Sequence, residues 1–472
     1  MTKLLYVDLD GTLLRGDSLH EACVRLLVRP SAWFAVLRSL FAGKADFKRN
    51  VAARSDLVAE SFAYRTDLLD WLRQEHANNR RLILATGADR AVASAVATHL
   101  GIFDGVLASD GSINLTGEAK LAAIQAHADG AEFCYVGDNA IDLKIWEQAS
   151  SAVLVGSAVQ FATQLGSTSV EARFPDQVNR PHDILRQLRP YQWAKNTLVF
   201  LPALAAHQFM APAVLSADLL LFAGFSLCAS GVYAANDLLD LPNDRAHAHK
   251  QNRPLASGAV TIPAGLLIAG ILPVLALGLA WLAAGWAGIG MLAGYWAVTT
   301  YYSVHGKSVP LLDVFLLAGL YTFRACAGAL TVPTGMSGWL GAFLLFFFFG
   351  LACLKRFSEL VGLPEGHEGR VAGRGYRRSD HQLMGTLGIG AGFAATLVLC
   401  LYATSSSVEV LYPNPLRLMA IAPLVLFGLS RLWLQAWRGE LHVDPVLHAL
   451  KDGVSYLLLA LCALVMFAAS LA

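Results

Sequence analysis

The chain has 472 residues, of which 55% are hydrophobic and 15% are charged, and its mean hydropathy is +0.49. This composition is too apolar for an average soluble globular protein and indicates a part embedded in a membrane. The formal net charge of +1 gives no overall indication of a nucleic-acid partner. The seven cysteines include no Cys-x-x-Cys pair, so we interpret them as small apolar side chains and not as a disulfide framework or a zinc site.

The N-terminal region carries charges every few positions, and short apolar segments alternate in it with helical stretches. This alternation predicts a parallel sheet in a doubly wound α/β domain over residues 1–180. The four-residue apolar run that ends at Asp8 is too short for a signal peptide, so we expect this domain to stay in the cytoplasm. The predicted strands are 4–7, 82–85, 105–108, 133–136 and 152–155.

Residues 18–78 predict a small helical cap between the first two strands. The cap contains an apolar patch, which either packs inside the cap or docks on a membrane surface. The patch consists of Trp33, Phe34, Val36, Leu37, Leu40 and Phe41.

Residues 181–472 form the predicted membrane domain, an all-α polytopic bundle. Its apolar segments are long enough to cross about 30 Å of hydrocarbon. We predict nine spans, near 197–212, 216–236, 261–282, 286–303, 310–330, 338–354, 384–404, 415–434 and 453–471. The loops after the even-numbered spans, counted together with Arg431 near the end of the eighth span, hold thirteen lysines and arginines, against Arg417 alone toward the other side. By the positive-inside rule these loops are cytoplasmic, and the protein is a multi-pass protein of the inner membrane.

Acidic and phosphate-binding residue types follow the predicted strands of the α/β domain. Because the carboxyl ends of parallel strands meet at one edge of the sheet, we expect these side chains to lie together there. They are Asp8 and Asp10 after the first strand, Thr86 after the second, Lys120 at a helix start, and Asp138 and Asp142 after the fourth.

This ordered set of four motifs resembles the haloacid dehalogenase superfamily over roughly residues 3–165. The resemblance implies that Asp8 is a phosphoryl nucleophile, that Asp10 is the general acid and base, and that the phosphoryl group is held by Thr86 and Lys120. It also implies Mg²⁺ ligands, namely Asp8, Asp10, Asp138 and Asp142. A carboxylate attacks a phosphoryl group only where cations offset the gathering negative charge. The alternatives are a solvated acidic turn and a domain that keeps the motifs without activity.

A second acidic group follows the second predicted span. Asn236, Asp240 and Asp244 recur every four residues, so on a helix they share one face. Such a row of acids at a membrane surface repels itself unless a cation lies between its members. Magnesium bridging to a diphosphate is the natural partner, and a solvated acidic loop is the alternative.

The pattern Asn-Asp-x-x-Asp-x-x-x-Asp, with Asp237 as its first acid, resembles the first motif of the UbiA superfamily of membrane prenyltransferases. The similarity runs from about residue 186 to the C-terminus. It implies that Asp237 and Asp240 are catalytic and that they bind Mg²⁺ together with Asp244.

The second acidic motif of that superfamily is missing, and Lys355, Arg356 and Glu359 stand in its place. A basic pair suits a substrate with an additional phosphate, so the chain is most similar to the branch of polyprenyl-phosphate (decaprenyl-phosphate) phosphoribosyltransferases. The other candidate substrate-binding residues are Lys195, Asn236, Lys250, Arg253, Tyr302, Lys307 and Arg324.

These resemblances imply transfer of 5-phosphoribose from phosphoribosyl diphosphate to polyprenyl phosphate. The N-terminal domain could then remove the 5-phosphate of the product. An aromatic prenyltransferase that uses a polyprenyl diphosphate is the alternative enzyme. A membrane carrier with a phosphate-sensing domain is a non-enzymatic alternative, but the charges cluster at one membrane face and do not line a path through it. A homo-oligomer is compatible with the sequence.

Overall fold

The computed structural model describes residues 4–27, 29–41, 43–110, 113–176, 180–364, 369, 371, 374–409, 411–441, 444–449 and 451–471. The chain forms two compact units. The first comprises Met1–Leu188 together with Tyr233–Ala269, and the second comprises Arg189–Val232 together with Gly270–Ala472. The acidic segment 236–244 therefore belongs to the same unit as the α/β domain.

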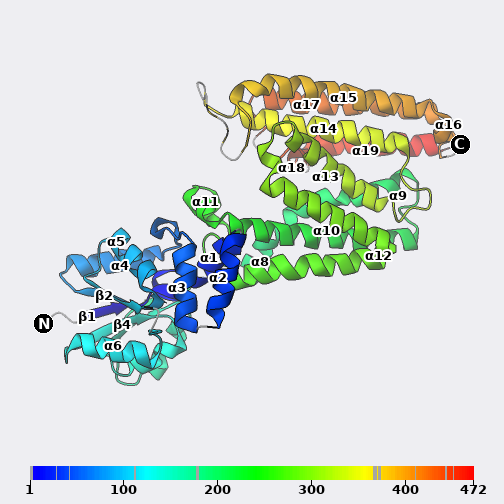
Figure 1. The fold of residues 1–472 in the computed structure, drawn as a ribbon. Helices are drawn as coiled ribbons and strands as arrows, with labels where there is room; N and C mark the ends of the chain where they lie inside the picture. The colour runs from blue at the N-terminus through cyan, green and yellow to red at the C-terminus, as the bar shows by residue number, and fades with distance from the viewer. Residues whose placement is uncertain are drawn as a thin grey trace. The chain divides into compact units, whose positions relative to one another are not determined.

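A six-stranded sheet forms the centre of the first unit (Figure 1). All of its strand pairs are parallel, and the order is β3-β2-β1-β4-β5-β6. The strands are β1 Leu4–Val7, β2 Leu82–Asp89, β3 Gly105–Ser109, β4 Phe133–Gly137, β5 Ser151–Val155 and β6 Ser169–Phe174. The predicted parallel α/β domain is confirmed. β6 was not predicted, because it is an edge strand with no fully buried residue and so no continuous apolar run.

Helices cover both faces of this sheet (Figure 1). Alternate residues of β1 point to opposite faces, so Leu5 packs in the core with α4 and α5, whereas Tyr6 packs in the core with α6 and α7. These helices are α4 Thr66–Ala77, α5 Arg90–Leu100, α6 Glu118–Ala128 and α7 Leu143–Trp146, and α8 Arg180–Leu188 follows β6.

Three helices form the cap between β1 and β2: α1 Ser18–Leu27, α2 Pro30–Leu40 and α3 Lys44–Arg54. Val36 packs against the small cap core. Phe34 and Phe41 are 80% and 93% exposed, so packing inside the cap explains only part of the apolar patch. The side chains of Leu37 and Leu40 lie outside the described part of the structure.

The chain is an integral membrane protein by the length and apolarity of its helices. Among the described residues six helices are long and apolar enough to cross a membrane: Pro212–Leu239, Ile262–Val304, Gly338–Val361, Arg378–Ala403, Pro415–Trp437 and Gly453–Ser470. These contain α10, α12, α14 (Gly338–Val361), α15 (His381–Ala403), α17 (Ile421–Trp437) and α19 (Gly453–Ser470).

The predicted count of nine spans is not confirmed. At 1.5 Å per residue the 43 residues of α12 would measure about 65 Å, twice the hydrocarbon thickness. Its helical path breaks at Ala284 and Gly285, and Ala280 and Leu292 from either side of the break share one core, so α12 consists of two helical segments that correspond to the predicted spans 261–282 and 286–303. α13 (Leu312–Gly328) has only 17 residues. The first predicted span is a 3-10 segment, Pro190–Phe200, followed by the short α9 (Leu201–Ala205).

Candidate active sites

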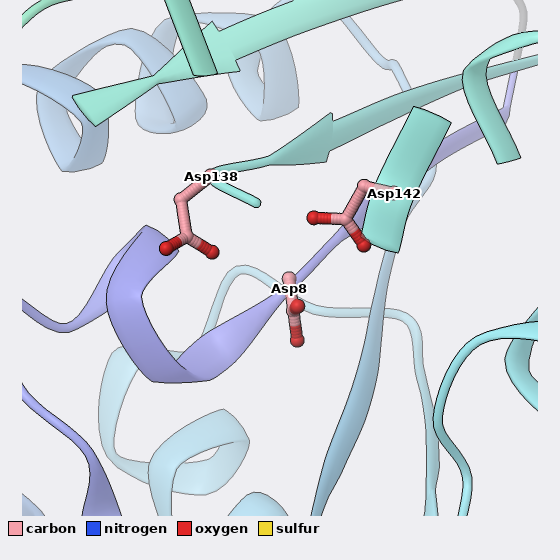
Figure 2. Close-up of side chains that lie close together, drawn as sticks. All are labelled: Asp8, Asp138 and Asp142. Atoms are coloured by element: carbon pink, nitrogen blue, oxygen red, sulfur yellow. The ribbon is translucent and has the colours of Figure 1, made fainter. Parts of the chain in front are cut away.

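Three carboxylates meet at the carboxyl edge of the sheet. Asp8 follows β1, Asp138 follows β4, and Asp142 ends the short turn before α7. One oxygen of each lies within 4.8 Å of the others, and Figure 2 shows the three side chains close together. The strand order causes this arrangement, because β1 and β4 are neighbours in the sheet.

Lys120 and Tyr135 complete the group. The Lys120 Nζ donates to Asp8 Oδ2 at 2.7 Å and to the Tyr135 hydroxyl at 3.0 Å, and that hydroxyl donates to Asp142 Oδ1 at 3.0 Å. Burial lowers the pKa of Lys120, but Asp8 and Asp142 outweigh this effect and raise it. Lys120 is therefore a fixed positive charge beside Asp8.

The electrostatics of the group favour a bound cation. Burial, followed by repulsion from Asp8, raises the pKa of Asp138 to about 7 and the pKa of Asp142 to about 6. Three oxygen ligands of this kind suit Mg²⁺. The backbone of Gly11 packs closely against the Asp138 side chain. A Cβ at this position, where φ is +76°, would lie only 2.3 Å from Asp138 Oδ2. The residues therefore fit a magnesium ion.

The other two residues expected at this site lie beside the group. Asp10 accepts the Ser18 backbone N–H at 2.8 Å, so its side chain is oriented by the start of α1 and is not one of the three clustered carboxylates. Burial and then the charge of Asp17 raise the pKa of Asp10 to about 7. Thr86 is fully buried, and its hydroxyl accepts the Ala88 N–H at 3.0 Å.

The acidic motif bridges the end of α10 and the six-residue α11 (Leu241–Ala246). Asp240 and Asp244 continue the helical backbone pattern, since their N–H groups donate to the carbonyls of Asn236 and Asp240 at 2.9 Å. Arg253 Nη1 lies 3.1 Å from Asp237 Oδ1 and 2.6 Å from Asp244 Oδ2. A guanidinium thus stands between two buried acids at the place where the sequence predicts a cation.

A second charged cluster lies in the second unit. Asp444 Oδ2 accepts from Lys195 Nζ at 3.0 Å and from Lys355 Nζ at 2.9 Å, and Asp444 Oδ1 lies 3.4 Å from the Tyr321 hydroxyl. Burial raises the pKa of Asp444, but the two lysines lower it by more. Burial lowers the pKa of Lys195 to about 8, although Asp444 opposes this shift. Two lysines from distant parts of the sequence therefore converge on one carboxylate.

Comparison with known proteins assigns a different family to the N-terminal part of the chain and to the part that follows it. The UbiA prenyltransferase family matches residues 197–364, and the haloacid dehalogenase-like hydrolases match residues 5–147. The uncharacterized protein y4nM of Sinorhizobium fredii is 36% identical over 468 residues, which cover 97% of this chain and 89% of that protein. The nodulation protein NoeC of Azorhizobium caulinodans is 35% identical over 269 residues, 57% of this chain and 86% of that protein. The chain belongs to the UbiA prenyltransferase family.

An N-terminal haloacid dehalogenase-like domain is fused to this UbiA domain, as predicted. The decaprenyl-phosphate phosphoribosyltransferase of Mycobacterium tuberculosis is also similar, with 33% identity over 184 residues that cover 38% of this chain and 60% of that protein.

Within the UbiA domain the structure separates the two members of the predicted basic pair. Lys355 joins Lys195, whereas Arg356 is fully buried, with its Nε 2.6 Å from Asp313 Oδ2 and with a short contact to Glu359. Its Nη2 also donates to the Tyr302 hydroxyl at 3.4 Å. Arg356 thus has carboxylate partners before any substrate binds.

Arg324 is also a buried binding-site candidate with protein partners. Its Nε donates to Asn196 Oδ1 at 2.7 Å, and its Nη2 donates to the Tyr295 hydroxyl at 2.7 Å. Among the remaining candidates, Lys250 Nζ lies 4.0 Å from Asp244 Oδ1, and Lys307 lies partly exposed in the turn Gly306–Ser308.

Sequence reasoning missed Asp444 and Asp313. Asp444 stands in a loop with no recognisable motif, and Asp313 is one acid at the start of an apolar helix. The only available signal was that a buried basic residue needs a partner, and this does not say which acid supplies it.

Proposed function

We propose that the UbiA domain transfers a 5-phosphoribosyl group from phosphoribosyl diphosphate to a polyprenyl phosphate at the cytoplasmic face of the inner membrane. The observation that carries this proposal is the convergence of Lys195 and Lys355 on Asp444, because two ammonium groups held together suit a phosphate of the donor. The similarity to the mycobacterial decaprenyl-phosphate phosphoribosyltransferase supports the same reaction.

In this reaction the acidic motif binds the leaving diphosphate through Mg²⁺. Asp237, Asp240 and Asp244 would hold Mg²⁺, which supplies positive charge to the departing diphosphate. Until then Arg253 neutralises Asp237 and Asp244. An oxygen of the lipid phosphate forms a bond to C1 of the ribose while the bond between C1 and the diphosphate oxygen breaks, so the products are the lipid-linked phosphoribose and free diphosphate.

The second part of the proposal is that the N-terminal domain is a Mg²⁺-dependent phosphatase that removes the 5-phosphate of this product. Asp8, Asp138 and Asp142 would hold the ion, which offsets charge on the phosphoryl group. Asp8 attacks phosphorus, Lys120 stabilises the charge that develops, and Asp10 gives its proton to the leaving alkoxide. Thr86 helps to hold the phosphoryl group.

The name of the family, prenyltransferase, favours transfer of a prenyl group, and the alternative is therefore a transferase that joins a polyprenyl diphosphate to an aromatic acceptor. One experiment separates the two reactions. Purified protein is incubated with labelled phosphoribosyl diphosphate and polyprenyl phosphate, and in parallel with polyprenyl diphosphate and an aromatic acceptor. Label in the lipid fraction of the first mixture supports the proposal, whereas product only in the second mixture rejects it.

A further inference from the structure

The phosphatase-like site opens into a cavity of about 530 Å³. One side of this cavity is the catalytic group, with Asp8, Lys120 and Asp138. Another part of the lining comes from the segment that follows the acidic motif, which we call the wall segment, residues 245–263. Both sides belong to the first compact unit. The cavity is therefore completed by a segment that the α/β domain itself does not contain.

A buried ion pair fixes the wall segment to the cap. Arg245 donates to both carboxylate oxygens of Glu21 on α1, each at 2.9 Å, and Glu21 is only 4% exposed. Arg245 also donates to the backbone carbonyls of Ser61 and Ala256, each at 2.8 Å. A paired guanidinium with this many acceptors holds a defined geometry.

Apolar packing and close backbone contact add to this attachment. Val24 of α1 shares one core with Leu255, Val260 and Ile262 of the wall segment. Gly258 has a φ of +78°, and a Cβ there would lie 2.7 Å from the Cβ of Arg15. The wall is thus a built part of the site.

The chemistry of the cavity differs from one side to the other. Leu255, Val260 and Ile262 give it an apolar wall. Ile262 is also the first residue of α12, an element long and apolar enough to cross a membrane, so this wall is continuous with a helix that can enter the membrane. Arg15 lines the same cavity, and within the described part of the chain its exposed guanidinium forms no ion pair. It supplies a positive charge to the lining in addition to that of Lys120.

We infer that this cavity takes an amphiphilic phosphomonoester, with its monoester phosphate at Asp8, a second anionic group at Arg15 and an apolar chain along the wall segment. The inference rests on the proposed phosphatase function. Asp8 forms a bond to phosphorus as the ester P–O bond breaks, and the leaving alkoxide takes a proton from Asp10. Water then cleaves the aspartyl phosphate and releases inorganic phosphate, while the alcohol stays in the membrane.

The test compares four esters with the full-length protein in lipid nanodiscs. Two are amphiphilic, a polyprenyl-phosphate-linked ribose 5-phosphate and a lysophosphatidate, and two are soluble, ribose 5-phosphate and p-nitrophenyl phosphate. We expect kcat/KM for at least one amphiphile to exceed that for ribose 5-phosphate by about ten-fold or more. Whichever amphiphile is faster shows whether the ester comes from the UbiA reaction or from the bulk lipid.

Variants test the assignment of the cavity. Arg15→Gln should lower the ratio of amphiphile to soluble kcat/KM about ten-fold, the factor expected for one charge-assisted contact. Val260→Thr, which keeps the volume and adds a hydroxyl to the wall, should lower it in the same direction. Arg73→Gln is the matched control, since Arg73 is an exposed arginine of α4 that pairs with Asp70 at 3.2 Å.

Two outcomes would overturn the inference, and they can be told apart. If the wild type hydrolyses soluble esters as fast as amphiphilic ones and Arg15→Gln leaves the ratio unchanged, the cavity assignment is wrong and the phosphatase function stands. If the wild type hydrolyses none of the four esters, both are wrong.

Discussion

Replacing Asp444 by Asn tests whether the two lysines of the second unit bind the donor. The Asp444 side chain is 9% exposed and lies within 3.0 Å of both Lys195 Nζ and Lys355 Nζ. Removing one partner of a buried ion pair costs about 3–5 kcal/mol. Water reaches Lys355, whose side chain is 27% exposed, so we expect a cost just below this range, about 2–3 kcal/mol. That loss corresponds to a fall in Tm of roughly 4–10 °C.

The donor should reverse much of this effect. In Asp444→Asn the two ammonium groups lack a counter-ion, so a phosphate that binds them stabilises the variant more than it stabilises the wild type. The assay is the shift in Tm on adding phosphoribosyl diphosphate to the purified protein. Asp452→Asn is the control, because Asp452 also accepts two short hydrogen bonds from a basic side chain, that of Arg431, and that pair does not include either lysine. An equal donor-induced shift in the wild type and in Asp444→Asn would refute the reasoning.

Three other changes test the remaining assignments. Asp8→Asn should lower the rate of phosphate-ester hydrolysis at least a hundred-fold and leave lipid labelling intact. Hydrolysis at the parent rate would mean that another residue is the nucleophile. Asp138→Asn should weaken Mn²⁺ binding, measured by electron paramagnetic resonance, at least ten-fold, and unchanged binding would place the ion at another site. Burial lowers the pKa of Lys195 to about 8, below its value of 10.5 in the unfolded chain, so donor affinity should fall as the pH rises through about 8. Between about pH 8 and 10.5 Lys195 is protonated in the unfolded chain but largely neutral in the folded protein. The free energy of unfolding should therefore rise with pH over this range. Lys195→Met should remove both trends, the first followed by donor titration and the second by Tm.

The sequence predicts the phosphatase-like site well because strand ends position it. Asp8 and Asp138 each follow a short apolar strand, and adjacent parallel strands place their carboxyl ends together. The surroundings of Lys355 could not be predicted in the same way. Its partner Asp444 lies 89 residues further along the chain, and no local pattern links the two. The break of α12 at Gly285 falls between two predicted spans, but the number of spans could not be predicted as well, because hydropathy does not reveal that Pro190–Phe200 forms a 3-10 segment followed by the short α9.

The fusion of the two domains has a structural consequence at α11. Asp244 and Arg245 are neighbours in this six-residue helix, yet they belong to different networks. Asp244 accepts from Arg253 within the acidic motif, while Arg245 holds Glu21 on the cap of the phosphatase-like domain. Both side chains are largely buried, so a short rigid helix connects them, and a displacement that changes one ion pair also moves the other. A UbiA domain without the N-terminal domain has no counterpart of Glu21 for Arg245. The fusion therefore does more than tether the two domains. Through the adjacent residues Asp244 and Arg245 it links the acidic motif directly to the wall of the phosphatase-like cavity.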